Sequence, residues 1–487
     1  MASRTGGGGS SITVVSMLVA ATYVFATIYA ISSSDYDTWG GLIVAGVLAV
    51  FSAPLLASLA KKDPDPKLGL ILVLAFVAKQ LGTFLRYIVV VRFLGGDALE
   101  YHEAGKALAP AIRAFDFGAP AFEEWVPDSI GGTSFIRVVT GTIYAGIGTS
   151  RLAGFMIFSF LGFWGLYLTF RAFRIGVPEG RHRRFALLLF FTPTLMFWPS
   201  SIGKESWLIF VIGLTVYGAA RFYTRQPFGI PCTALGLLGS AMVRPHLTVL
   251  LLAALILGRV VGRIGRRTDR GVFRRTLGKV VVLALIIGGT VMTIGRASSF
   301  FNVDELDAEG VTAILDETQR RSSQGDSAFT PTRVTSPIGL PVAVVTVLFR
   351  PFPHEAHNLQ ARATALESLL LLGFAVTSWR QLVRLPSMVR RYPIIAFATV
   401  FVLIFVIAFS AVGNFGILAR QRTQVLPFLF MLLALPKRRR SSGGTTTADA
   451  DTDTDPDLDG HDEAPEPVGP RGPRIVAPVT PMRRLRP

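Results

Sequence analysis

The chain contains a series of long apolar runs, and their length limits the folds that it can adopt. A helix needs about 20 apolar residues to cross roughly 30 Å of hydrocarbon, because each residue adds about 1.5 Å. Such runs recur along most of the 487 residues, and we predict membrane spans over residues 11–32, 41–60, 68–91, 152–172, 185–200, 206–221, 230–245, 247–263, 279–296, 363–379, 393–411 and 421–435. The sequence therefore predicts an all-α polytopic membrane protein with about 12 transmembrane helices.

Two further apolar stretches, residues 135–148 and 337–349, are too short to cross as single helices. We assign them as re-entrant or interfacial segments, and the sequence leaves open whether either one spans the membrane.

The overall composition and charge agree with this class. Hydrophobic residues make up 51% of the chain and charged residues 17%, against about 25% charged residues in soluble domains. An ordinary cytosolic enzyme and a mainly disordered chain are both excluded. The net charge of +17 would indicate nucleic acid in a soluble protein, but here the basic residues stand in clusters between apolar runs, so we expect no nucleic-acid partner. The single cysteine, Cys232, excludes an intrachain disulfide framework.

The basic clusters predict which loops face the cytoplasm. They fall on alternate sides of the predicted spans, in residues 61–67, 171–184, 221–225, 259–279, 380–391 and 437–440. Positive loops stay on the cytoplasmic side, so both termini are predicted to be cytoplasmic. The chain then divides into a short cytoplasmic N-terminus (1–10), a polytopic membrane domain (11–436) and a cytoplasmic tail (437–487), which lacks the apolar content to fold and is predicted to be disordered. Two outer loops, 92–134 and 297–336, are too long to be simple connectors.

Polar side chains near the outer ends of the spans are the candidate functional residues, because lipid disfavours buried charge. The first cluster, Gly95 to Glu103, opens a predicted amphipathic helix that lies on the membrane and runs to about Ala114. Asp97 and Glu100 would share one face of this helix and could act as general base or acid. The alternative for Asp97 is a structural role as helix N-cap, since Glu100 follows it three residues later as in a capping box. The capping role and the catalytic role are compatible.

Four further clusters are predicted to lie at the same outer boundary. They hold the candidate ligands of a lipid phosphate: Lys204, Glu205, Arg244, His246, Arg350, His354, Glu355, Arg420 and Arg422. Arginine suits phosphate because its planar fork donates two hydrogen bonds in parallel. The alternatives are an interfacial ion pair for the lysine and glutamate, and snorkelling to lipid headgroups for the arginines. Inside the third span, Lys79 and Arg86 lie seven residues apart, roughly on one helix face, and could pair with acids or extend the same cationic cavity.

Metal motifs are weak in this sequence. The run from His354 to His357 has its histidines three residues apart between prolines, so it departs from the H-E-x-x-H zinc pattern. Residues 455–466 fit a calcium-loop pattern, but two prolines lie inside it and no helices flank it. We predict no metal site and no cofactor, and a divalent cation remains an open alternative.

Together these residues predict one outer cavity that binds a phosphate or pyrophosphate carried by a lipid, with a carboxylate that deprotonates an acceptor hydroxyl. Gly96-Asp97-Ala98 followed by Tyr101, the surface helix, the polar second outer loop and the many spans resemble the GT-C superfamily of polyprenyl-phosphate-sugar-dependent glycosyltransferases. The resemblance implies a polyprenyl-phosphate-linked sugar donor, a glycan or lipid acceptor, and a base at Asp97 with Glu100 as substitute. In that superfamily the acidic loop usually follows the first span, whereas here it follows the third.

Two other functions remain open. Arg350-Pro351-Phe352-Pro353 and Arg420-Gln421-Arg422 are also similar to lipid-linked oligosaccharide polymerases and ligases, which use a polyprenyl-pyrophosphate donor. A flippase or transporter of a lipid-linked substrate would instead place charge near the bilayer midplane and on both faces. We expect a protein of the bacterial plasma membrane with its site on the outer face.

Overall fold

The computed structural model describes residues 8–63, 65–127, 129–261, 329, 337–357 and 359–436, and its regular elements within these ranges are all helical. Five helical segments are long and apolar enough to cross a membrane: Tyr36–Lys61, Pro66–Phe93, Arg151–Gly176, Lys204–Tyr223 and Leu359–Thr377. The prediction of an all-helical chain with membrane-spanning segments is confirmed at this level. The total of 12 spans stays a prediction.

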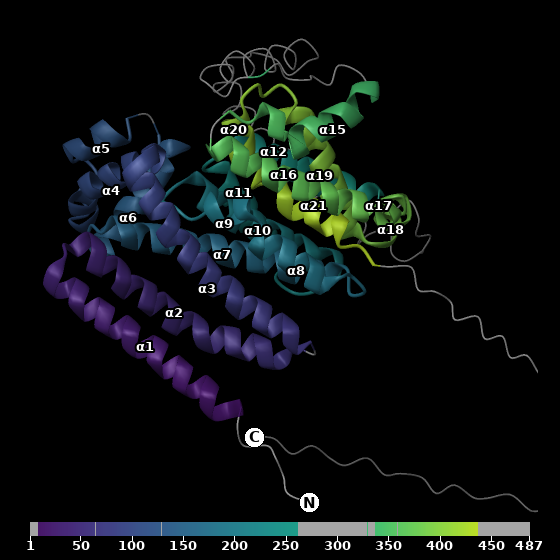
Figure 1. The fold of residues 1–487 in the computed structure, drawn as a ribbon. Helices are drawn as coiled ribbons and strands as arrows, with labels where there is room; N and C mark the ends of the chain where they lie inside the picture. The colour runs from purple at the N-terminus through teal and green to yellow at the C-terminus, as the bar shows by residue number, and fades with distance from the viewer. Residues whose placement is uncertain are drawn as a thin grey trace, which may run out of the picture. The chain divides into compact units, whose positions relative to one another are not determined.

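The described helices fall into two series, before and after residues 262–336 (Figure 1). The first half contains α1 (Gly8–Ser33), α2 (Tyr36–Lys62), α3 (Pro66–Val89), the π-helical turn η1 (Val90–Leu94), α4 (Asp97–Arg113), α5 (Pro120–Trp125), α6 (Thr133–Ile147), α7 (Arg151–Gly176), α8 (His182–Phe191), α9 (Pro193–Phe197), α10 (Lys204–Tyr223), α11 (Gly229–Ala241) and α12 (Pro245–Val261). The second contains α15 (Leu340–Phe349), α16 (Leu359–Thr377), α17 (Trp379–Leu382), α18 (Leu385–Arg391), α19 (Pro393–Phe409), α20 (Phe415–Arg422) and α21 (Leu426–Leu433), with single 3-10 turns at Pro337–Gly339 and Pro353–Glu355.

Helix α3 has one face turned inward and one face turned outward. The inward face carries Leu72, Phe76, Lys79, Thr83 and Arg86, which recur every three or four residues and are all buried. Large apolar side chains cover the outward faces of α2 and α3, among them Phe51, Leu81 and Leu85, exposed by 72%, 64% and 58%. An apolar outer surface around a core that holds charged side chains is the pattern expected of helices that face lipid.

Helices α7 and α10 pack in parallel and at very close range. Gly154 faces Ile202 at one end of the pair, and Gly165 faces Gly213 further along both helices. A Cβ atom at Gly213 would lie 2.0 Å from the carbonyl oxygen of Gly165, so only glycine fits there. Small residues of this kind let membrane helices approach until their backbones touch.

We expect Gly213→Val to lower the free energy of unfolding by about 1–3 kcal/mol, because the added side chain would push α10 away from α7. Gly373→Val is the matched control, since no atom lies within 4 Å of a Cβ at that helical glycine. Thermal unfolding of the two purified variants, followed by tryptophan fluorescence, compares them. Equal unfolding midpoints would show that the close contact between α7 and α10 is unimportant.

Two predicted spans are not single helices. Residues 185–200 are divided between α8 and α9, because Pro193 lacks an N–H group and holds Thr192 in an extended conformation with ψ 124°. Residues 421–435 are divided between the end of α20 and α21, an eight-residue helix that is buried along its whole length. At about 1.5 Å per residue, α8 and α21 reach only about 15 Å and 12 Å, less than the thickness of a bilayer.

Several other predictions can be placed on the structure. The short segments 135–148 and 337–349 correspond to α6 and α15, of 15 and 10 residues, and their re-entrant or interfacial position stays a prediction. The predicted surface helix is α4, which packs closely on α6. The span 279–296, the calcium-like residues 455–466, the tail 437–487, most of the N-terminus 1–10 and the outer loop 297–336 apart from Phe329 lie outside the described residues.

Candidate functional site

Asp97 is the first residue of α4, and two glycines form the turn before it. Gly95 and Gly96 have φ of +62° and +90°, backbone angles that residues other than glycine adopt only with strain. Gly96, and not Asp97, is the N-cap, and no side chain caps this helix. The predicted capping role of Asp97 is therefore wrong. Its Oδ2 instead accepts a hydrogen bond of 2.7 Å from Nη2 of Arg420.

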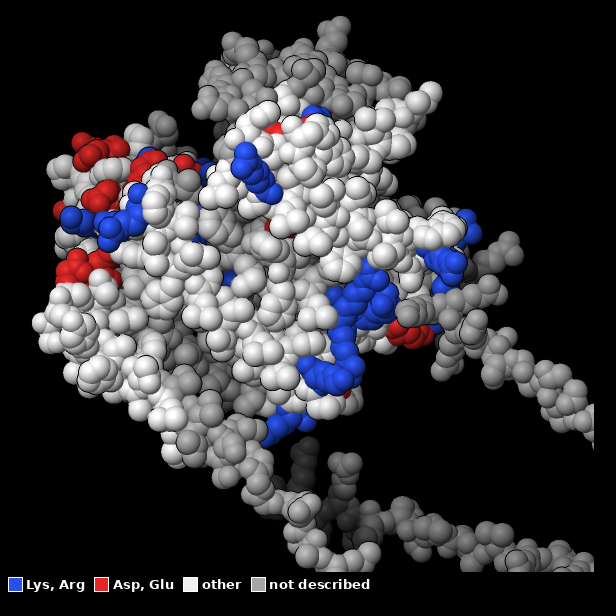
Figure 2. Space-filling view, in the orientation of Figure 1, with Lys and Arg blue, Asp and Glu red and all other residues white. Residues whose placement is uncertain are grey.

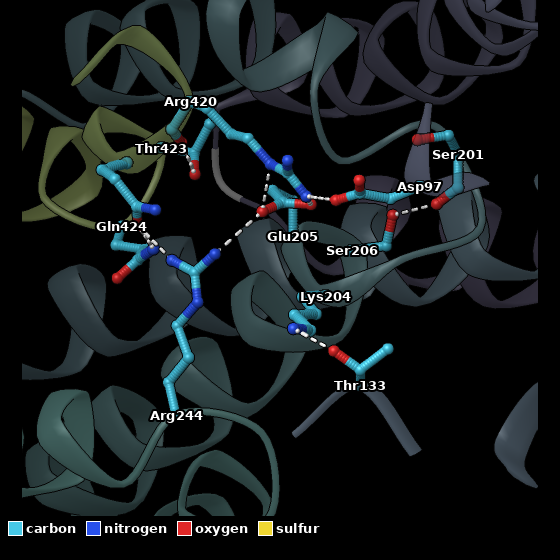
Figure 3. A network of polar contacts seen from close by, with 11 residues as sticks. Asp97, Thr133, Ser201, Lys204, Glu205, Ser206, Arg244, Arg420, Thr423 and Gln424 are labelled. Carbon is cyan, nitrogen blue, oxygen red and sulfur yellow. Dashed lines mark hydrogen bonds and ion pairs between the residues drawn. The ribbon is translucent and has the colours of Figure 1, made fainter. Parts of the chain in front are cut away.

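Glu205 joins two arginines from distant parts of the chain (Figure 3). Its Oε1 accepts hydrogen bonds from Nε of Arg420 at 2.6 Å and from Nη2 of Arg244 at 3.1 Å. Its Oε2 accepts a third bond from Nη2 of Arg420 at 3.0 Å. The Glu205 side chain is only 7% exposed, and a carboxylate so buried needs cationic partners in this way.

Two glutamines complete what we call the Glu205 network, which consists of Asp97, Glu205, Arg244, Arg420, Gln421 and Gln424. Nη1 of Arg244 donates to Oε1 of Gln421, and Nε2 of Gln424 donates to the same oxygen at 2.6 Å. The network thus joins the beginnings of α4 and α10, the turn between α11 and α12, and the end of α20.

Lys204 stands beside this network and adds a third cation. It is the first residue of α10, after Gly203 with φ of +154°, and its Nζ donates to Oγ1 of Thr133 at 2.8 Å. Ser206 secures the same turn by donating to the carbonyl oxygen of Ser201 at 2.8 Å. Three cations, Lys204, Arg244 and Arg420, therefore surround two carboxylates, so the site has an excess of positive charge.

The exposure of the side chains increases across the network, from Glu205 to Asp97. The side chains of Glu205 and Arg244 are 7% and 12% exposed, those of Arg420 and Asp97 28% and 50%. Burial alone would raise the pKa of the Asp97 carboxyl, but the charge and hydrogen bond of Arg420, with help from Lys204, hold that pKa below its usual value. Asp97 is thus an ionised, accessible carboxylate, which is the form that a general base requires.

Four other predicted residues, Glu100, Arg350, His354 and Glu355, contact partners outside the network. Glu100 forms an ion pair with Arg137 of α6. Arg350 pairs with Glu355 only five residues away, with Nε–Oε distances of 2.9 and 3.1 Å, and its guanidinium lies over the rings of Phe329 and Phe415. His354 stacks on Phe352.

Arg422 and His246 complete the placement of the predicted ligands. Arg422 points away from Glu205, and its Nη1 donates to Oγ of Ser368 at 3.0 Å. His246 is the second residue of α12 and follows Arg244 by two positions, so its backbone lies close to the network. The structure thus unites Asp97, Glu205, Arg244 and Arg420, with Lys204 beside them, and brings Glu100, Arg350, His354, Glu355 and Arg422 to other partners.

The two cations of α3 contact the segment that precedes the site. Lys79 donates from Nζ to the carbonyl oxygens of Leu195 and Met196 at 3.1 and 3.4 Å. Arg86 lies over the rings of Phe197 and Trp198, 4.2 and 4.9 Å from their centroids. Neither side chain forms an ion pair with an acid in the described ranges. The predicted alternative, in which Lys79 and Arg86 pair with acids, therefore does not apply within those ranges.

Sequence reasoning assigned no role to Gln421, Gln424 or Thr133. Gln421 was visible between two arginines, but an amide gives no charge signal, and Gln424 and Thr133 have no local motif at all. Among the described residues, no three side chains of His, Cys, Asp or Glu are grouped to hold a metal ion. No family model, no curated protein and no solved structure matches the chain.

Proposed function

We propose that this protein is an integral membrane glycosyltransferase of the GT-C type, which transfers a sugar from a polyprenyl-phosphate donor to a cell-envelope glycan or lipid acceptor. The proposal includes 12 spans, cytoplasmic termini and a site on the outer face of the plasma membrane. One observation carries it: Arg420 lies between the accessible carboxylate of Asp97 and the buried carboxylate of Glu205. A base and a phosphate ligand are thus in direct contact.

In the proposed reaction, the donor phosphate takes the place of Asp97 on Nη2 of Arg420. Glu205 remains bound to Nε of the same guanidinium and keeps it in position. The freed Asp97 carboxylate accepts the proton of the acceptor hydroxyl while that oxygen bonds to the anomeric carbon. The bond from this carbon to the phosphate oxygen breaks, and the leaving polyprenyl phosphate keeps the electron pair. Arg420 and Lys204 stabilise its charge.

The pyrophosphate alternative, an enzyme that resembles oligosaccharide polymerases or ligases, has less support. It depended on Arg350 and Arg422 as well as Arg420. Arg350 pairs with Glu355, and Arg422 binds Ser368. A compact set of three cations suits a single phosphate better than an extended pyrophosphate.

Transport of an anionic or lipid-linked substrate is the second candidate, and a specific observation favours it. Lys79 is 3% exposed and lies near the middle of the 28-residue segment Pro66–Phe93. A cation at that depth is typical of substrate pathways in transporters. Both candidates use the same anionic headgroup and differ in whether a glycosidic bond is broken.

Purified protein in proteoliposomes with a labelled polyprenyl-phosphate sugar separates the two candidates. We expect Arg420→Ala to weaken the apparent affinity for the donor by about tenfold to 100-fold, since it removes charge-assisted hydrogen bonds of about 1.5–3 kcal/mol. Arg92→Ala, which removes an exposed arginine, should behave as wild type. Movement of intact donor across the vesicle without sugar transfer would contradict the enzyme and support the transporter.

A further inference from the structure

A cavity of about 360 Å³ lies at the other end of α3 from the Glu205 network. The connection between α2 and α3 and the connection between α7 and α8 form its walls. Its lining residues are Asp63, Asp65, Leu68, Arg174, Gly180, Arg181, His182, Arg183 and Arg184. The segment Pro66–Phe93 separates it from Asp97, and 28 residues of helix extend about 42 Å. The cavity is therefore about one membrane thickness from the candidate active site, at the level of lipid headgroups if α3 spans the bilayer.

The cavity has more positive charge than its acids neutralise. Asp63 pairs with Arg174, and Asp65 pairs with Arg183 through both carboxylate oxygens. Two further arginines, Arg181 and Arg184, line the same space without a carboxylate partner in the described ranges. Figure 2 shows Lys and Arg side chains gathered on this face, where α8 and the adjoining ends of α2 and α3 lie in Figure 1.

Arg184 is held by neutral groups. Its Nη2 donates to Oγ of Ser378 at 2.6 Å and to the carbonyl oxygen of Phe374 at 3.2 Å, which ties the cavity to the end of α16.

Arg181 differs from its neighbours in the cavity. Its backbone N–H donates to the carbonyl oxygen of Ala434 at 2.9 Å, which anchors the beginning of α8 to the end of α21. Its side chain has no hydrogen bond or ion pair with any residue that the structure describes. The backbone of Arg181 is held in place, and its guanidinium lines the cavity without a partner in the described ranges. This guanidinium is therefore available to bind an anion.

We infer that this cavity binds the phosphate group of an anionic phospholipid, with Arg181 as its principal ligand. Its volume falls in the range of small-ligand sites, about 300–1,000 Å³. Basic pockets between membrane helices are known to accept anionic headgroups, and arginine matches phosphate with two parallel hydrogen bonds. The site is separate from the Glu205 network, and the inference does not depend on the proposed enzymatic activity.

The test uses the full chain in nanodiscs of phosphatidylcholine, with phosphatidylglycerol added in increasing proportion. Native mass spectrometry counts the phosphatidylglycerol molecules retained, and thermal unfolding reports stabilisation. We expect Arg181→Gln to weaken phosphatidylglycerol retention by about fivefold, the effect of about one arginine near a membrane surface. Arg390→Ala, which removes an exposed arginine outside the cavity, should retain the lipid as wild type does.

Two results would overturn the inference. The first is equal phosphatidylglycerol retention by wild type and Arg181→Gln, provided that both have the same unfolding midpoint in pure phosphatidylcholine. If Arg181→Gln unfolds early, Arg181→Met, which also removes the charge, replaces it, and the same comparison applies. The second is stabilisation by inorganic phosphate in phosphatidylcholine discs equal to that by phosphatidylglycerol, because it would assign the cavity to a free anion.

Discussion

Replacing Asp97 with asparagine should lower the turnover number for sugar transfer by about 100-fold to 10,000-fold, the usual contribution of a general base. Asparagine has nearly the same shape and still offers an oxygen to Nη2 of Arg420, but it accepts no proton. Donor affinity should be unchanged or slightly higher, because the donor phosphate no longer competes with a carboxylate for Arg420. Steady-state kinetics with a polyprenyl-phosphate sugar separates kcat from KM.

The pH profile gives a second readout for Asp97. In the free protein Arg420 and Lys204 hold the pKa of Asp97 below its ordinary value of 3.8. A lowered pKa keeps the carboxylate ionised at every pH above it, so kcat/KM should be flat from neutral pH down to about pH 4. When the donor phosphate occupies Arg420, this support is lost. The acid limb of kcat should therefore lie at higher pH than that of kcat/KM.

The matched control is Glu123→Gln, an exposed carboxyl in the same segment between α3 and α6, which should retain full activity. Glu100→Gln separates the two predicted bases, because Glu100 is committed to Arg137 and should lose little turnover. Retained transfer in Asp97→Asn together with a loss in Glu100→Gln would move the base to Glu100. Retained transfer in both variants would mean that neither residue is the base.

Most helix positions could be predicted from the sequence, and the reason is physical. A run such as 152–172 must satisfy its backbone internally if lipid surrounds it, so apolar length alone predicts α7 to within a few residues. The same reasoning failed at 185–200 and 421–435. There Pro193 and Pro427 lie inside apolar runs, and apolar composition concealed a break that proline imposes.

The candidate site was predicted in part, and the geometry of single helices explains what was missed. Arg420 and Arg422 are two residues apart, about 200° around a helix, so they point to opposite sides of α20 and only one can reach Glu205. Arg350 and Glu355 are near enough in sequence to satisfy each other. Which distant side chains meet Glu205 depends on the packing of α4, α10 and α20, and no local pattern contains that information.

The buried centre of the network leads to the second large effect. We expect Glu205→Ala to lower the free energy of unfolding by about 3–5 kcal/mol, because it leaves the buried Arg244 without a carboxylate and leaves Arg420 with only the half-exposed carboxylate of Asp97. The midpoint of thermal unfolding should fall accordingly. Glu179→Ala is the control, since its ion pair with Arg391 is more than half exposed and should contribute almost nothing.

The double variant Glu205→Ala/Arg420→Ala distinguishes charge from packing. If the loss in Glu205→Ala comes from uncompensated cations, removal of one cation should restore part of the stability, and the two changes should be strongly non-additive. Simple addition of the two losses would instead indicate that Glu205 acts as a space-filling side chain. Because Glu205 binds both Nε and Nη2 of Arg420, that outcome would also remove the basis for treating Arg420 as a positioned phosphate ligand.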